Sequence, residues 1–138
     1  MRNLLWAILL TAAPFLSGCV ETRMYTIPDT PDKKGLYALM EARCEALNKA
    51  DFSLFKKIYI QDSPELQWIA DQGIPMWREN GMSYSVRSFE RITIIGDDAA
   101  GRFTLAGHNR FGRSFFARVE ALFARQGGEW KIESTGER

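Results

Sequence analysis

The period of the hydrophobic residues changes near Gly81, and this change constrains the fold more than any other feature of the chain. Before Gly81, apolar side chains recur at the three-to-four-residue spacing that places them along one side of an α-helix. After it, they recur at every second residue, which places them on one face of a β-strand. Helices followed by strands with short turns predict an α+β domain, with helices packed on one face of an antiparallel sheet.

Three helices are expected before the change in period. The second begins after Asp51, whose carboxylate can accept a hydrogen bond from a first-turn amide. The third begins after Ser63, with Pro64 at the first helical position, and is expected to break near Gly73 and end by Asn80. The first covers residues 33–50, and its apolar stripe comprises Leu36, Met40, Cys44 and Leu47.

The strands that follow differ in how regularly they alternate. Residues 113–125 alternate throughout, and Gly127 with Gly128 is a signal for a tight hairpin after them. Residues 83–96 are less regular, because Glu90 falls on the apolar side and Phe89 on the other. Either Glu90 points inward, or a bulge near Phe89 switches the face. The inward residues of the regular strand are Phe115, Ala117, Val119, Ala121 and Phe123.

Besides this pattern, several short stretches of sequence resemble those of a known superfamily. They are Lys49-Ala50-Asp51-Phe52 between the first helices, Asp97-Asp98-Ala99-Ala100 at a turn, Gly112 before the long strand, and the terminal Gly128-Glu129-Trp130-Lys131-Ile132. Over residues 33–135 the chain resembles the nuclear transport factor 2-like (cystatin-like) domains, a superfamily that includes ketosteroid isomerase and polyketide cyclase relatives. The resemblance implies a strongly curved sheet that wraps the helices into a cone, often with an apolar pocket at its open end.

The first residues have the features of a secretory signal. Arg2 supplies a positive start, and residues 4–16 form an apolar run. As a helix this run would span about 20 Å, which is shorter than the roughly 30 Å core of a bilayer. A membrane-spanning helix is therefore not expected here.

The end of this run, Leu16-Ser17-Gly18-Cys19, resembles the lipobox of bacterial lipoproteins. The resemblance implies that residues 1–18 are removed and that Cys19 becomes the lipidated first residue, held in the membrane by several acyl chains. Residues 19–32 are then expected to be a tether, and residues 33–138 the folded domain. Val20 in place of an aspartate favours the outer membrane, facing the periplasm. The alternative is an uncleaved anchor with a chance cysteine.

The charge balance argues against nucleic acid as a partner. Without Arg2 the chain has 17 basic and 17 acidic residues, so it lacks the excess positive charge that a polyanion requires. If Cys19 is lipidated, Cys44 has no other cysteine to pair with in the chain. Its place on an apolar stripe predicts a buried, unreactive thiol rather than a redox or nucleophilic one.

Catalytic residues are hard to identify in this sequence. The candidates are Glu90, Tyr84 on the same face in one register, and His108, the single histidine. Glu90 lies between two arginines and His108 in a polar stretch, so a solvated role is the favoured interpretation for both. A single histidine also excludes a His-based triad or a multi-histidine metal site, and no cofactor or metal is expected.

The sequence thus predicts a lipid-anchored envelope protein with a binding or assembly role, and it leaves the ligand unidentified. An enzyme or carrier that uses the cone pocket is the alternative. Phe116 and Leu122 on the outward side of the long strand suggest a partly covered face, so a homodimer through the outer sheet face is a further hypothesis. The residues that could line a pocket, or belong to the core instead, are Trp68, Trp77, Tyr84, Phe103 and Phe115.

Overall fold

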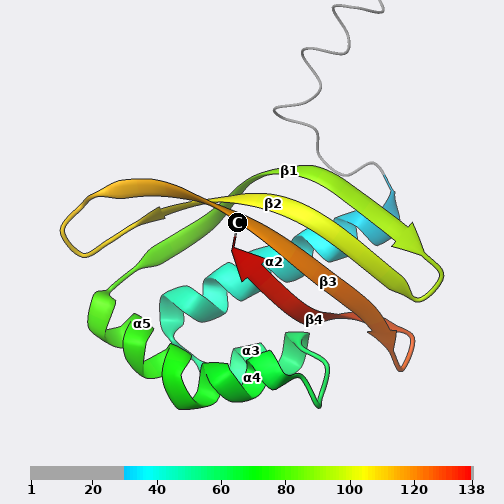
Figure 1. Ribbon diagram of the computed structural model, residues 1–138, viewed down its shortest axis with the longest axis horizontal. Helices are drawn as coiled ribbons and strands as arrows, with labels where there is room; N and C mark the ends of the chain where they lie inside the picture. The colour runs from blue at the N-terminus through cyan, green and yellow to red at the C-terminus, as the bar shows by residue number, and fades with distance from the viewer. Residues whose placement is uncertain (1–29, 138) are drawn as a thin grey trace, which may run out of the picture.

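The computed structural model describes residues 30–137, in which helices come first and strands follow (Figure 1). The helical elements are α2 (Pro31–Lys49), α3 (Phe52–Ile58), α4 (Pro64–Trp68), the π-helical turn η1 (Ile69–Gly73) and α5 (Ile74–Asn80). The strands are β1 (Ser83–Ile95), β2 (Asp98–His108), β3 (Ser114–Gln126) and β4 (Glu129–Glu137). They form one antiparallel sheet in the order β1-β2-β3-β4, so the predicted α+β fold is confirmed.

Helix α2 begins two residues before the expected start at residue 33. The Thr30 hydroxyl accepts a hydrogen bond from the Lys33 amide (3.3 Å), and Pro31 occupies the first turn, where a missing amide proton costs nothing. Asp32, assigned to the tether from the sequence, accepts hydrogen bonds from Arg125 (3.0 Å) and from the Trp130 indole (3.3 Å). The folded part of the chain therefore includes residues 30–32.

The other helix boundaries follow the predicted capping residues. The Asp51 carboxylate accepts a hydrogen bond from the Ser53 amide (2.9 Å), and the Ser63 hydroxyl accepts one from the Leu66 amide (3.4 Å). The expected break near Gly73 is the π-helical turn between α4 and α5. A β-carbon at Gly73 would lie 2.9 Å from the Trp77 ring, so close packing requires glycine there.

Two bulges in β1 decide which face of the sheet Glu90 occupies. The pairing of β1 with β2 shifts between Val86 and Ser88 and again between Phe89 and Arg91. Each bulge adds one residue to β1, so the residues that follow it lie on the opposite faces from those that strict alternation would give. As a result Phe89 faces the helices, with its ring 6.0 Å from that of Tyr37, and Glu90 lies on the outer face.

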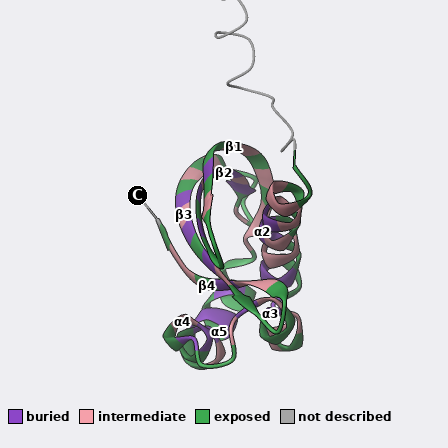
Figure 2. Ribbon diagram, turned by 90° about the vertical axis from the view of Figure 1, so that its right-hand side faces the viewer, coloured by how far each residue is buried: buried purple, intermediate pink, exposed green. Residues whose placement is uncertain are grey.

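The core lies between the inner face of the sheet and the helices. Figure 2 shows α2 running along this face, with buried residues on the sides that the two layers turn toward each other. Each large apolar side chain that leaves water here contributes about 1.5–3 kcal/mol. The largest fully buried side chains are Tyr59, Phe55, Phe103, Phe123, Leu36, Met40, Ile69, Leu105 and Ile132.

Strand β4 covers only part of β3. The pairing runs from Val119 opposite Glu137 to Gln126 opposite Glu129, across the predicted Gly127-Gly128 hairpin. Ser114–Arg118 therefore has β2 on one side and no neighbouring strand on the other among residues 30–137. This segment forms a free edge at one end of the sheet (Figure 1).

Candidate functional site

The interior of the domain is filled by aromatic rings. Phe103 is fully buried and Trp77 is 9% exposed, so these two predicted pocket residues belong to the core. The Phe55 and Trp77 rings stack with centroids 5.5 Å apart, and Trp68 contacts Trp77 edge-on at 6.0 Å while remaining 42% exposed. The core, rather than a pocket, accounts for the position of Trp77 and Phe103.

The two remaining predicted pocket residues, Tyr84 and Phe115, contact each other at the free end of the sheet. Their rings meet edge-to-face with centroids 5.7 Å apart, and both residues are partly buried. They line a hollow of about 920 Å³ formed by residues of β1, of β2 and of the part of β3 that β4 does not cover. Its lining residues are Met82, Tyr84, Arg87, Ser88, Thr104, Phe115, Phe116, Ala117 and Arg118.

Two guanidinium groups give this hollow a positive character. Arg87 lies over the Phe116 ring, with its guanidinium carbon 4.6 Å from the ring centroid. No ion pair joins Arg87 or Arg118 to an acidic side chain within residues 30–137. The hollow thus combines aromatic surface with unneutralised positive charge, a combination that suits an amphipathic anion.

The candidate catalytic residues lie apart from one another. Glu90 is on the outer face, 3.8 Å from Arg102, whereas Tyr84 packs against Phe115 on the inner side. His108 ends β2, is exposed, and has one ring nitrogen 2.7 Å from the Ser83 hydroxyl. The structure therefore does not bring Glu90, Tyr84 and His108 into one site.

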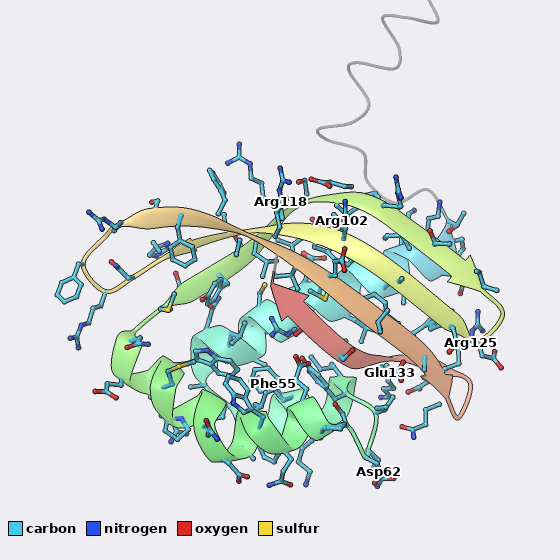
Figure 3. The ribbon with its side chains drawn as sticks, viewed as in Figure 1. Phe55, Asp62, Arg102, Arg118, Arg125 and Glu133 are labelled. Atoms are coloured by element: carbon cyan, nitrogen blue, oxygen red, sulfur yellow. The ribbon has the colours of Figure 1, made fainter. Side chains whose placement is uncertain are left out.

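The outer face of β3 has a regular pattern of side chains. Arg118 and Glu120 lie at its centre, with Phe116 (63% exposed) on one side and Leu122 (48% exposed) on the other. Glu120 also accepts a 2.9 Å hydrogen bond from Arg102 on the adjacent strand. Both Arg102 and Arg118 lie on the side of the sheet away from the helices (Figure 3). This face is therefore not fully polar, and no part of residues 30–137 covers it.

A partly buried polar cluster, which the sequence gave no reason to expect, joins α2, α4 and β4. The Arg43 guanidinium donates hydrogen bonds to the Tyr59 hydroxyl (2.9 Å) and the Thr135 hydroxyl (3.1 Å). The Thr135 hydroxyl in turn donates to the Glu65 carboxylate (2.6 Å). Burial raises the pKa of Tyr59 well above its ordinary value, so this phenol stays neutral.

The cluster has the character of a structural lock rather than a ligand site. Every buried side-chain nitrogen and oxygen in the described part of the chain has a hydrogen-bond partner, so none is left for a ligand to satisfy. Its members come from elements far apart in sequence, and Glu65 at the start of α4 has the appearance of an ordinary first-turn acid. No local sequence signal could have identified this cluster.

Cys44 lies where its apolar stripe places it. The side chain is 3% exposed on α2, and burial raises the pKa of the thiol from 9.0 to about 11. A thiol with such a pKa is almost entirely protonated at neutral pH, and the thiolate is the reactive species. The predicted burial of Cys44 is confirmed.

Cys19, the signal segment and most of the tether lie outside the described residues. Residues 30–137 include no helix of the length and apolarity that a membrane crossing requires. The same part of the chain contains no cluster of three or more histidine, cysteine or acidic side chains that could hold a metal ion.

The fold is similar to that of solved nuclear transport factor 2-like proteins with a cystatin-like fold. One similar solved structure is a protein of unknown function with a cystatin-like fold from Nostoc punctiforme, with a TM-score of 0.66 and 17% identity; the match covers 80% of this chain and 93% of that one. A nuclear transport factor 2-like protein from Novosphingobium aromaticivorans has a TM-score of 0.61 and 14% identity, covering 77% and 80%.

A third similar structure carries a name that refers to assembly. It is described as a calcium/calmodulin dependent protein kinase II association domain from Xanthomonas campestris, with a TM-score of 0.63 and 14% identity, and the match covers 84% of this chain and 93% of that one. No family model matches the sequence, and no curated protein matches it. At these identities the structural likeness establishes the fold.

Proposed function

We propose that this chain is a lipoprotein of the bacterial envelope whose domain works by assembly, as a homodimer that forms through the outer face of the sheet. The lipid is attached to Cys19, at the end of the apolar run of the signal segment. The domain begins at Thr30 and Pro31, so about ten residues separate it from the lipid.

The pattern of side chains on β3 is the observation that supports the homodimer. Along the outer face the order is Phe116, Arg118, Glu120, Leu122, which is apolar, positive, negative, apolar. A two-fold axis between Arg118 and Glu120 would place each arginine against the partner's glutamate and each Phe116 against the partner's Leu122. Self-complementarity of this kind is what an isologous interface requires.

Burial and charge support the same interface. Phe116 and Leu122 are the large apolar side chains that the outer face of β3 leaves exposed, and an interface would remove both from water. Arg118 forms no ion pair with an acidic side chain within residues 30–137. Glu120 of the second subunit would therefore neutralise Arg118 without breaking an ion pair that Arg118 already makes. The similar Xanthomonas campestris domain is also named for association.

Charge reversal along β3 tests the interface directly. We expect Arg118→Glu and Glu120→Arg each to weaken dimerisation about tenfold or more, because each places like charges face to face across the axis. The double variant restores the opposite pairing and should dimerise again. Sedimentation velocity over a range of concentrations measures the three dissociation constants, and Lys56→Glu on the helical side is the control. A wild-type monomer at high concentration, or a double variant as weak as the singles, contradicts the proposal.

The lipid anchor has an independent test. Cys19→Ala should abolish incorporation of labelled palmitate and release the protein from the membrane fraction, because the acylated thiol is lost. Intact-mass measurement of the native protein should show a chain that starts at residue 19 with added acyl mass. A native chain that retains residues 1–18, or a bare Cys19 thiol, would rule out the anchor while leaving the dimer untouched.

The hollow at the free edge of β3 favours a second candidate function, a carrier of a small amphipathic anion. Its aromatic surface and unneutralised arginines are the observation behind this candidate. Native mass spectrometry of the purified protein tests it, since a carried molecule adds a defined mass. Phe115→Ala removes a ring from the hollow but not from the outer face of β3, so it should release a carried molecule and leave the dimer intact.

A further inference from the structure

The loop that joins β2 to β3, residues 109–113, presents an aromatic side chain to water. Phe111 at its tip is 81% exposed. Ile95, the last residue of β1 at the opposite end of the sheet, is 76% exposed, and these two residues are the most exposed large apolar side chains in the described part of the chain. A single exposed apolar residue is unremarkable in itself, so its surroundings decide whether it has a role.

Hydrogen bonds fix the shape of the Phe111 loop. The Asn109 side-chain oxygen accepts from the amides of Phe111 (3.0 Å) and Arg113 (3.1 Å). The Asn109 backbone accepts from the Gly112 amide (3.0 Å) and donates to the Arg113 carbonyl (3.1 Å). Gly112 has φ +79°, a conformation that glycine adopts without strain. Phe111 is thus held outward by a closed turn.

The loop is also attached to the end of α5. Arg110 donates a hydrogen bond to the Glu79 carbonyl (3.3 Å), near the C-terminus of that helix. A β-carbon on Gly81 would lie 3.0 Å from the Arg110 β-carbon, which shows how closely the two segments pack. The Arg110 guanidinium also lies over the Phe111 ring, 4.9 Å from its centroid.

Along the chain, the charge next to Phe111 is positive, and the acidic residue that the packing of α5 brings beside the loop is Glu79, whose carbonyl bonds to Arg110. Arg110 and Arg113 flank Phe111, and residues 99–119 contain no acidic side chain. Ile95 differs, because Asp97 and Asp98 follow it in the opposite turn. In a chain with nearly equal numbers of acidic and basic residues, an exposed aromatic ring between two arginines is a distinct surface feature.

From this arrangement we infer that the Asn109–Arg113 loop is a contact point for an anionic phospholipid surface. Phe111 enters the headgroup region, and Arg110 and Arg113 face the lipid phosphates. A membrane fits this tip better than a protein does, because a stable protein interface needs about 800 Å² from each partner and one protruding side chain offers far less.

The loop and the start of α2 lie at opposite ends of the domain (Figure 1). In a lipid-anchored chain, contact through the loop would lay the domain along the membrane rather than leave it free to turn. Weak binding suffices in that case, because the anchor keeps the loop close to the bilayer. The loop itself needs no lipid on Cys19, so the inference does not depend on the anchor.

Vesicle co-sedimentation of an unlipidated protein tests the contact. The protein is the chain from residue 19 with Cys19→Ser, its folding checked by circular dichroism, mixed with vesicles of phosphatidylethanolamine and phosphatidylglycerol or of phosphatidylcholine alone. We expect partition into the anionic vesicles that falls about tenfold with Phe111→Ser, the effect of losing one buried aromatic side chain. Arg113→Gln should lower it about fivefold. Ile95→Ser is the matched control and should leave it unchanged.

Four results would overturn the inference, the first three of which concern the anionic vesicles. These three are a wild-type protein that does not bind the anionic vesicles at any lipid concentration, a Phe111→Ser variant that binds as well as wild type, and an Ile95→Ser variant that loses as much as Phe111→Ser. Equal binding to phosphatidylcholine would also overturn it, because the arginines would then have no part in the contact.

Discussion

The two faces of β3 show how one strand serves two purposes. Phe123 on the inner face is 1% exposed, whereas Phe116 on the outer face is 63% exposed. Both are phenylalanines on the same strand, and the alternation of the strand alone sends them to opposite sides. The inner face holds the fold together, and the outer face is available for contacts beyond the chain.

The polar groups of the domain divide in the same way. Inside, Arg43 and Glu65 both bond to Thr135 in the partly buried polar cluster. Outside, Arg102 bonds to Glu120 (2.9 Å) with its side chain 42% exposed. Buried polar groups depend on their partners, whereas exposed ion pairs exchange readily with water. The comparison therefore predicts that substitutions on the inner side lower the free energy of unfolding strongly, and that substitutions on the outer face change it little.

The largest difference should appear between two phenylalanines. Phe103→Ala removes a fully buried ring and should lower the free energy of unfolding by about 3–5 kcal/mol. Phe116→Ala on the outer face should change it by about 0.5 kcal/mol or less in the monomer. Urea denaturation of both variants measures the values. Equal losses would mean that the outer face is as tightly covered as the core.

Because Cys44 is buried, the free energy of unfolding should fall at alkaline pH. The Cys44 thiol has a pKa of about 11 in the fold against 9.0 in a free chain, so the unfolded state loses its proton first. The contribution is fully present below pH 9 and is lost as the pH rises through about 11, a loss of about 2–3 kcal/mol. Denaturation at several pH values should show this loss in the wild type and not in Cys44→Ala. The same slope in both proteins would assign it to other groups.

The partly buried polar cluster should be more sensitive to substitution than an exposed threonine. Thr135→Val keeps the shape of the side chain but removes the hydroxyl that Arg43 and Glu65 share. We expect a loss of about 1–3 kcal/mol in the free energy of unfolding, because charged groups lose a partly buried partner. Thr93→Val on the exposed outer face of β1 is the control. If both variants are equally stable, water replaces the lost hydroxyl.

The smallest effect should come from the outer ion pair. Arg102→Ala removes the contacts with Glu120 and Glu90, yet all three side chains are substantially exposed. Such pairs contribute about 0–1 kcal/mol, and salt screens them. Denaturation at low and high ionic strength measures the effect. A loss as large as that of Thr135→Val would show that this face is shielded from solvent.

Local signals in the sequence were sufficient for the helices and turns. Asp51 and Ser63 cap the helices that the sequence assigned to them, and the expected break at Gly73 is a π-helical turn. Capping and turn preferences depend on a few neighbouring residues, so they can be recognised without knowledge of the fold. The expected start of α2 is two residues late, because apolar periodicity begins only at Leu36 whereas Thr30 caps the helix and Pro31 opens it.

The candidate site was less accessible from sequence. Tyr84 and Phe115 do line a common hollow, but Trp77 and Phe103, equally aromatic and apolar, are buried in the core. Aromatic character does not distinguish a pocket from a core, since both favour large apolar rings. The side on which Glu90 lies depended on bulges in β1, whose position is set by pairing with β2.

By itself the sequence determined the order of helices and strands, the inward face of β3 and the burial of Cys44, because hydrophobic periodicity is a local property of the chain. Only the tertiary structure decided which face Glu90 takes, that Arg43, Glu65 and Thr135 meet, and that β4 leaves an edge of β3 free. Those features depend on strand pairing and on contacts between residues tens of positions apart, which no local pattern encodes.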